Sequence, residues 1–303
     1  MITEYKGGKL TWIDAENPSS EEARDLLLAH GFPPSLMGDL STSGTRDGVR
    51  AESGTLKITL HFPIVKRTDI DHPHELKFIL NKTALLSVRY EDMEAIHRFQ
   101  KEFEVIGALY KTKRQANGAH LFFALLREFY NTLEAKLDYL ETRMRDIERE
   151  IFSAREKEMV FSISEVSRKL IAFRQTVSSH TDQLKSFAVF IEKNFGTKTH
   201  EPFMEIMEQH AALLRRTNGL FDTLDELQNT NLAMLSTKQN EIIKNLTIVA
   251  MTTFPLTLFA SLFSMNTLRT PIVGLQGDFW IILSIMTGGV IALFGFFRFK
   301  HWF

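Results

Sequence analysis

The sequence predicts an α+β cytosolic domain followed by long helices and two C-terminal transmembrane helices, and three observations support this fold class. Near the N-terminus, apolar and polar residues alternate with the period-2 pattern of a β-strand. From about residue 118, apolar residues recur every seven positions, which indicates long helices packed on one another. Near the C-terminus, the runs 245–268 and 279–297 contain no charged residue, and each is long enough to cross an apolar layer of about 30 Å.

The first domain is expected to span residues 1–115 and to be mixed α/β. In the segment 55–62, Leu56, Ile58, Leu60 and Phe62 alternate with polar residues, which predicts a strand with one buried face. The segment 76–80 repeats the pattern, and a turn at Asn81-Lys82 leads into an apolar strand over 84–88. Helices are expected after Asn17-Pro18, where a capping residue and early acids precede Gly31, and over residues 92–105.

Residues 116–200 are expected to form an antiparallel pair of long helices. Two sets of residues seven positions apart form the seam of the first helix: Leu126, Leu133, Leu140 and Ile147, and Tyr130, Leu137, Met144 and Ile151. A similar seam from Val166 to Ile191 predicts the second helix. It includes His180, which we interpret as a core histidine with a hydrogen-bond partner. After a loop at 194–196, a third helix is expected to begin near Glu201, and its part 201–244 forms a cytosolic stalk.

Residues 245–303 are expected to form a two-helix transmembrane region with an external loop at 264–278. The run 279–297 holds eleven Phe, Ile, Leu or Val residues, which favour insertion by several kcal/mol. Lys and Arg flank the two runs on their outer sides, whereas the loop has only Arg269, so both termini are expected in the cytoplasm. The N-terminal residues contain no apolar segment typical of a signal peptide. We therefore expect a multi-pass protein of the cell (inner or plasma) membrane.

Composition argues against several classes of function. The formal net charge of -1 gives no field that would favour a nucleic-acid partner. The chain contains no Cys, which excludes disulfides, thiolate metal sites and cysteine nucleophiles. Gly7-Gly8 precedes a predicted strand and does not follow one, so it does not form a Gly-rich phosphate loop. No catalytic Ser/His/Asp set or carboxylate pair can be assigned to a pocket. The sequence therefore predicts no enzyme and no cofactor.

The C-terminal residues 240–303 resemble the last third of the CorA family of divalent-cation channels. That family carries an Asn-Glu pair, a Lys-x-Leu-Thr segment, a Pro-Leu-Thr in mid-span and a terminal Tyr-Gly-Met-Asn. The matching segments here are Asn240-Glu241, 244–247, Pro255-Leu256-Thr257 and 263–266. Two features differ: Ser264-Met265-Asn266 replaces Gly-Met-Asn, and the external loop lacks the acidic residue of the family, since only Asp278 lies near it.

The resemblance implies a funnel-shaped homopentamer in which the first span of each subunit lines a pore for divalent cations, with magnesium as the expected ion. Asn266 would then bind the water shell of the ion, beside Ser264 and Met265 at the pore mouth. Phe254 and Ile243 would form apolar constrictions. Helical steps of three and four give the pore-lining stripe, which comprises Asn240, Ile243, Thr247, Ala250, Phe254, Thr257, Ser261 and Ser264. The small and polar residues of this stripe would also fit close helix packing without a pore.

Acidic residues and histidines provide further candidates. Asp222, Glu226 and Asn229 continue the stripe into the stalk, where they could attract cations or form a solvated face. Glu201, Glu205 and Glu208 lie where the family has part of a regulatory metal site, with Glu205 best aligned, although ion pairs would explain them equally. His72-Pro73-His74 could bind a metal but has too few ligands at zinc spacing.

Two alternatives remain open from the sequence. One is a transporter of zinc, cobalt or nickel from the same superfamily. The other is a membrane-anchored sensor or scaffold that keeps the assembly and does not conduct, which the Ser264 substitution and the sparse acidic loop favour. The membrane, divalent cations and further copies of the chain are the expected partners.

Overall fold

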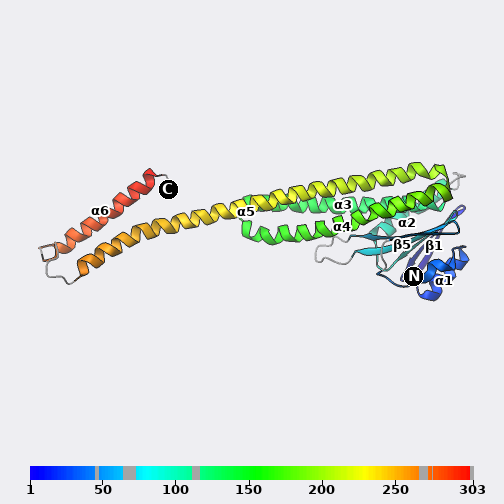
Figure 1. Ribbon diagram of the computed structural model, residues 1–303, viewed down its shortest axis with the longest axis horizontal. Coiled ribbons are helices and arrows are strands. Elements are labelled where there is room, and N and C mark those ends of the chain that lie inside the picture. The colour runs from blue at the N-terminus through cyan, green and yellow to red at the C-terminus, as the bar shows by residue number, and fades with distance from the viewer. Residues whose placement is uncertain (45–47, 64–72, 111–116, 266–271, 275, 301–303) are drawn as a thin grey trace. The chain divides into compact units, whose positions relative to one another are not determined.

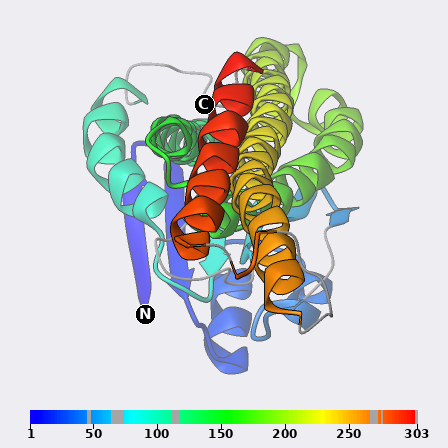
Figure 2. The same cartoon turned by 90° about the vertical axis from the view of Figure 1, so that its left-hand side faces the viewer.

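The computed structural model describes residues 1–44, 48–63, 73–110, 117–265, 272–274 and 276–300. The chain divides into two compact units, Met1–Gln228 and Asn229–Phe303. The long helix α5 (His200–Ser264) contributes to both units, and α6 (Asp278–Phe299) belongs to the second. Within the second unit, the orange part of α5 and the red α6 lie side by side in both views (Figures 1 and 2).

The first unit contains a six-stranded sheet with the strand order β1-β2-β6-β5-β4-β3. Strands β2 and β6 pair in parallel, and all other neighbours pair antiparallel. Asp14 of β2 and Arg89 of β6 form a buried ion pair at 3.0 Å across the parallel strands, and burial raises the pKa of the Asp14 carboxyl. The strands are β1 (Ile2–Gly7), β2 (Leu10–Glu16), β3 (Gly48–Glu52), β4 (Thr55–Phe62), β5 (His74–Leu80) and β6 (Ala84–Arg89).

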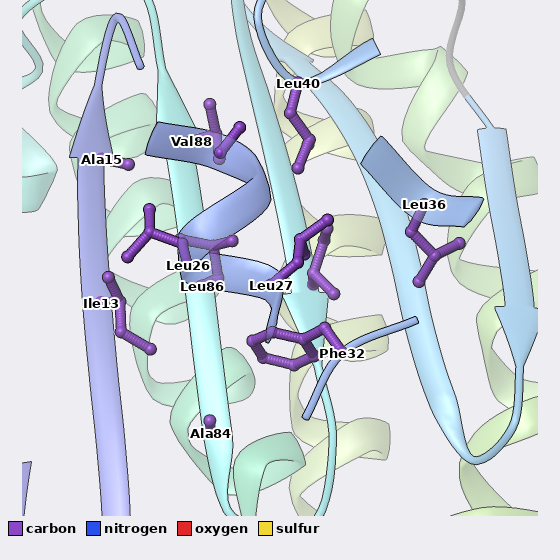
Figure 3. Close-up of a cluster of buried hydrophobic side chains, with 12 residues drawn as sticks. Ile13, Ala15, Leu26, Leu27, Phe32, Leu36, Leu40, Ala84, Leu86 and Val88 are labelled. Carbon is purple, nitrogen blue, oxygen red and sulfur yellow. The ribbon is translucent and has the colours of Figure 1, made fainter. Parts of the chain in front are cut away.

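One face of the sheet is covered by α1 (Ser20–Ala29) and the short 3-10 helix η1 (Pro34–Asp39). Helix α1 begins at a capping box: the backbone N of Glu22 donates to Ser19 Oγ, and the backbone N of Ser19 donates to the Glu22 carboxylate. The apolar side chains of α1, η1 and the strands interdigitate in one buried cluster (Figure 3). The cluster fixes this helical layer on the sheet and leaves the opposite face for the long helices.

The opposite face packs against α2 (Glu94–Tyr110), α3 (Gly118–Phe152) and α4 (Glu156–Phe195). Aromatic pairs join the layers. Trp12 of β2 meets Phe99 of α2 with ring centroids 4.8 Å apart, and Phe78 of β5 meets Phe122 of α3 at 5.2 Å. These edge-on contacts bury large apolar rings, which stabilises the unit mainly through removal of surface from water.

The expectation of one buried face on the strand at 55–62 is wrong, because β4 is buried on both faces. Thr55, Lys57 and Thr59 are as inaccessible as their apolar neighbours. Residues 40–44 cover this side, where Lys77 Nζ donates to the Thr42 carbonyl at 2.5 Å and the backbone N of Gly44 donates to the Glu75 carboxylate. Lys77 and Glu75 of the adjacent strand β5 therefore have hydrogen-bond partners, which lowers the cost of burying them.

The seams predicted for the long helices are confirmed. All eight seam residues of α3 are at most 2% exposed, and α3 turns into α4 through Ser153, Ala154 and Arg155. His180 is confirmed as a core histidine: its Nε2 donates to the His61 carbonyl at 2.6 Å, and Tyr130 OH donates to its Nδ1 at 3.3 Å. In the same layer, His210 of α5 donates from Nε2 to the Val177 carbonyl at 2.9 Å.

The predicted fold class is confirmed, with the α+β domain, the long helices and two C-terminal helices long and apolar enough to cross a membrane. The third long helix begins at His200, one residue before the predicted start. Strands β1 and β3 and the helix η1 have no counterpart in the sequence analysis. The finer domain bounds predicted from the sequence remain a prediction.

Candidate ion pathway

In the second unit, α5 and α6 pack through one face each. The least exposed residues of α6 recur every three or four positions, which places them on a single face: Ile282, Met286, Val290, Leu293 and Phe297. On α5 the corresponding residues are Ile248, Thr252, Leu256 and Phe263. Ile248 is 6% exposed and Phe297 is 2% exposed. Because the two helices lie side by side in both views (Figures 1 and 2), these faces form the contact between them.

The predicted pore-lining stripe lies on the other side of α5. At about 100° per residue, the centre of the stripe is roughly opposite the face that packs on α6. The two large apolar residues of the stripe are exposed, Ile243 to 50% and Phe254 to 72%, whereas Thr247 and Ala250 are half-buried. Asn240, Thr257, Ser261 and Ser264 are exposed. A stripe of small and polar residues on the uncovered side of an apolar helix can face water or protein more readily than lipid.

Hydroxyl groups on the apolar part of α5 are bonded within the helix. Thr247 Oγ1 donates to the Ile243 carbonyl at 2.8 Å, Thr257 Oγ1 to the Thr253 carbonyl at 2.9 Å, and Ser264 Oγ to the Ser261 carbonyl at 3.0 Å. These bonds satisfy the hydroxyl protons without water, and each oxygen keeps acceptor capacity for a partner beyond the helix. The helix also holds Pro255, which has no N–H to donate one turn back.

The predicted pore mouth is only partly within the described residues. Ser264 is the last residue of α5, and the backbone N of Met265 donates to the Leu262 carbonyl at 3.4 Å. The Met265 side chain is exposed. Asn266, the residue to which the resemblance assigns the hydrated ion, lies outside the described residues.

Two acidic residues of the predicted stalk, Asp222 and Glu226, lie in the first unit on the exposed side of α5. The opposite side of this segment carries the buried Leu220, Leu224 and Leu227. Neither carboxylate forms an ion pair with a described residue. Asn229, at the start of the second unit, is also exposed. These side chains are therefore available to solvent or to a cation.

The regulatory-site candidates do not converge in one chain. Glu201, Glu205 and Glu208 are all exposed, and Glu205 pairs with Arg127 at 2.5 Å. This pair favours the ion-pair interpretation of Glu205. His74 contacts the Glu91 carboxylate, and His72 lies outside the described residues. Across the described ranges, no group of three His, Cys, Asp or Glu is arranged to hold a metal.

Sequence reasoning did not single out His210 or the face of α5 that packs on α6. His210 could have been found from its spacing, because it lies on the buried stripe with Ile206 and Leu213. The α6-facing residues include Thr252, and a hydroxyl in an apolar run gives no indication of which side it faces. The two sides of α5 can be told apart only from the position of α6.

Comparisons with known proteins agree on one family. The family model described as "CorA-like Mg2+ transporter protein" matches residues 7–301. The "Cobalt/magnesium transport protein CorA" of Methanocaldococcus jannaschii is 21% identical over 308 residues, which cover 98% of this chain and 93% of that protein. The protein of the same name from Thermotoga maritima is 22% identical over 62% of this chain, and the match spans about half of that relative (54%).

A solved structure has the same fold. "The complete structure of CorA magnesium transporter from Methanocaldococcus jannaschii" aligns with a TM-score of 0.81 at 19% identity, covering 99% of this chain and 94% of that chain. At this identity the likeness concerns the fold, including the long helices and the C-terminal helical pair.

Proposed function

This chain belongs to the family of CorA-like Mg2+ transporter proteins, and on this premise we propose that it carries Mg²⁺ across the membrane through a pore that five copies build from α5. The family is one of membrane transporters of divalent cations and not a class of enzymes. The single observation that carries the proposal for the pathway is the position of the polar, small stripe on the side of α5 that α6 leaves uncovered.

Two spans from one chain cannot enclose a water-filled path, so the stripe needs further copies. When several α5 helices meet at an axis through this stripe, α6 lies outside and faces lipid. Its exposed apolar residues suit that position, since Ile281 is 40% and Ile291 67% exposed. The fivefold number is the one that the family resemblance implies.

Chemistry at the mouth favours a hydrated ion. Mg²⁺ holds its water shell strongly, and neutral amide oxygens can accept hydrogen bonds from that shell without stripping it. We assign this role to Asn266, with Ser264 and Met265 beside it. The carboxylates of Asp222 and Glu226 would raise the local concentration of cations, and the Asn229 amide oxygen would offer them a neutral acceptor. Both termini are proposed to lie in the cytoplasm of a cell with this protein in its inner or plasma membrane.

The choice of ion has a second candidate. Both relatives described above are named as cobalt and magnesium transport proteins, so Co²⁺ is the next ion to test, together with Zn²⁺ and Ni²⁺. Mg²⁺ could also act as a regulatory ion at the interface between copies. Glu205 is the candidate ligand there, in competition with its ion pair to Arg127.

Flux into liposomes tests the function. The purified full-length protein is reconstituted with a metal-sensitive dye inside the vesicles, and Mg²⁺, Co²⁺, Zn²⁺ or Ni²⁺ is added outside. We expect Mg²⁺ entry through the wild type and its loss in Asn266→Ala, while Ser264→Gly is tolerated. The matched control is Asn194→Ala, which removes an amide from α4, outside the proposed pathway, and should retain flux. Vesicles without Mg²⁺ entry, or full flux in Asn266→Ala, would contradict the proposal.

A further inference from the structure

Three cationic side chains lie at the end of the α5–α6 hairpin that is remote from its loop. Lys244 is on α5, Arg298 is in the last turn of α6, and Lys300 is the residue that caps α6. All three side chains are exposed. None of them forms an ion pair with an acidic residue in the described part of the chain.

Helix geometry places these three side chains at a similar distance from the loop end of the hairpin. Lys244 lies 20 residues before the end of α5 at Ser264, and Arg298 lies 20 residues after the start of α6 at Asp278. At a rise of 1.5 Å per residue, both are about 30 Å from the loop end of the hairpin. This distance equals the thickness of the hydrocarbon core of a bilayer, about 30 Å. The cations therefore emerge at the level of the lipid headgroups.

Packing between the helices also brings the cations to one side. Lys244 is one turn from Ile248 and on the same face of α5, and Arg298 and Lys300 flank Phe297 on α6. Ile248 and Phe297 are the most buried residues of the two apolar helical segments. Glu241, one turn farther from the apolar segment, is the nearest acidic residue in sequence and leaves the cluster with a net positive charge.

Apolar surface continues from the cations toward the loop end. Met251 on α5, two turns from Lys244 and on the same side of the helix, is 53% exposed, and Phe296 on α6 is 55% exposed. A ligand that fits both features has an anionic head and an apolar tail. A soluble phosphate would meet the charges and leave the apolar surface uncovered.

We propose that Lys244, Arg298 and Lys300 bind the phosphate headgroup of an anionic phospholipid, whose acyl chains lie along the exposed apolar faces of α5 and α6. The inference rests on the proposed function only in that both helices span a membrane. Each Lys or Arg near a membrane surface contributes about fivefold to the binding of anionic lipid, so three of them give a preference on the order of 100-fold over a zwitterionic lipid.

Native mass spectrometry of the purified full-length protein tests this site. The protein in detergent is mixed with equal amounts of phosphatidylglycerol and phosphatidylcholine, and the retained lipids are counted. We expect the wild type to retain phosphatidylglycerol preferentially and the triple variant Lys244→Gln/Arg298→Gln/Lys300→Gln to lose the preference. The matched control, Lys9→Gln/Arg24→Gln/Lys185→Gln, removes the same charges from exposed positions of the first unit and should keep it.

Two further measurements keep the test decisive if the triple variant does not fold. The charge-retaining variant Lys244→Arg/Arg298→Lys/Lys300→Arg should bind phosphatidylglycerol like the wild type. Soluble glycerol phosphate at the same concentration should not displace the lipid. Equal retention of both lipids by the wild type, unchanged preference in a folded triple variant, or displacement by glycerol phosphate would overturn the proposal. None of these readouts requires ion flux, so they are independent of whether the protein conducts.

Discussion

Phe254 is the largest side chain on the stripe, and it precedes Pro255, where the helix lacks one backbone hydrogen bond. Rings from several copies at one axis would form an apolar constriction that an ion passes only after the constriction widens and fills with water. We expect Phe254→Ala to raise the basal leak of Mg²⁺ into liposomes roughly tenfold, which corresponds to about 1.4 kcal/mol removed from the barrier.

The control for this gate is Phe294→Ala on α6, where the ring is 50% exposed and lies away from the stripe. It should leave the leak at the wild-type level, and both variants should keep the oligomer size. Equal leak from the two variants would show that Phe254 has no special place on the pathway.

His210 makes the stability of the first unit depend on pH. Burial lowers the pKa of its imidazole below the ordinary 6.5, so the folded state holds the neutral ring, which donates to the Val177 carbonyl. When the pH falls through 6.5, the unfolded chain takes up a proton that the folded chain does not. Stability should therefore decrease on acidification from pH 7.5 to 5.5, by at most about 1.4 kcal/mol per pH unit from this group.

Thermal unfolding of the detergent-solubilised protein at several pH values measures this effect. His210→Gln keeps an N–H donor for the Val177 carbonyl and removes the titration, so its Tm should fall less on acidification. His200→Gln, at an exposed position, should retain the wild-type pH dependence. An identical acid response in His210→Gln and the wild type would be evidence against this role.

At the scale of elements, the start of α3 is fixed by a close approach to the turn between β5 and β6. A Cβ on Gly118 would lie 2.1 Å from the Asn81 carbonyl oxygen and 2.7 Å from that of Ala84. Both are backbone atoms of a turn that the Asn81 side chain holds through its bonds to Thr83 and Ala84. Gly118→Ala must displace either the turn or the helix, and we expect a loss of about 3 kcal/mol in the free energy of unfolding.

Gly219→Ala is the matched control for this prediction. Gly219 lies inside α5 with open space where a Cβ would be, so alanine should stabilise the helix by up to about 1 kcal/mol. Thermal unfolding of both variants measures the difference. A Gly118→Ala protein as stable as the wild type would mean that the turn adapts without cost.

The elements that the sequence predicted are those whose burial follows a regular period. The seam residues of α3 repeat every seven positions, and the repeat itself reports which side is buried. Strands β1 and β3 were missed because both are edge strands of the sheet. Much of their surface is exposed, so they carry no clear alternation and are formed by pairing with β2 and β4. Lys57 and Thr59 alternate with apolar residues as solvent-facing side chains do, and the segment 40–44, which bonds to Lys77 and Glu75 on the neighbouring strand, is not part of that local pattern.

The candidate pathway was predictable to a similar degree. The family resemblance selects the first span as pore-lining, and helical spacing then gives the members of the stripe from Asn240 to Ser264, since helical periodicity is local. Whether that stripe faces a neighbour, lipid or α6 depends on where α6 packs, and the burial of Ile248 and Phe297 is what identifies the opposite side as uncovered. The polar composition of the stripe and its position on the side of α5 that α6 leaves uncovered then both indicate a surface that faces water or protein.

At the scale of the whole molecule, the proposal requires several copies. A single chain has one stripe, and its exposed residues in α5 have no cover within the described chain. Native mass spectrometry of the protein in mild detergent should return a homopentamer of 34.8 kDa subunits. Cross-linking between single cysteines introduced at Ser261 should join neighbouring copies. A protein that remains monomeric or dimeric in detergent and in membranes could not form the pore.

The central claim is that the stripe on α5 lines the ion path, and substituted-cysteine accessibility tests it most directly. The chain contains no native Cys, so each variant carries a single thiol. Thr257→Cys lies on the stripe, and its control, Thr252→Cys, lies on the face that packs on α6. Both threonines bond back to a helix carbonyl at 2.8–2.9 Å, so the two changes are chemically alike.

Both variants are reconstituted in liposomes, and Mg²⁺ entry is recorded before and after a small cationic thiol reagent is added. The account predicts that the reagent blocks entry through Thr257→Cys and leaves Thr252→Cys and the wild type unaffected. Block of Thr252→Cys with undiminished flux through a fully modified Thr257→Cys would contradict it.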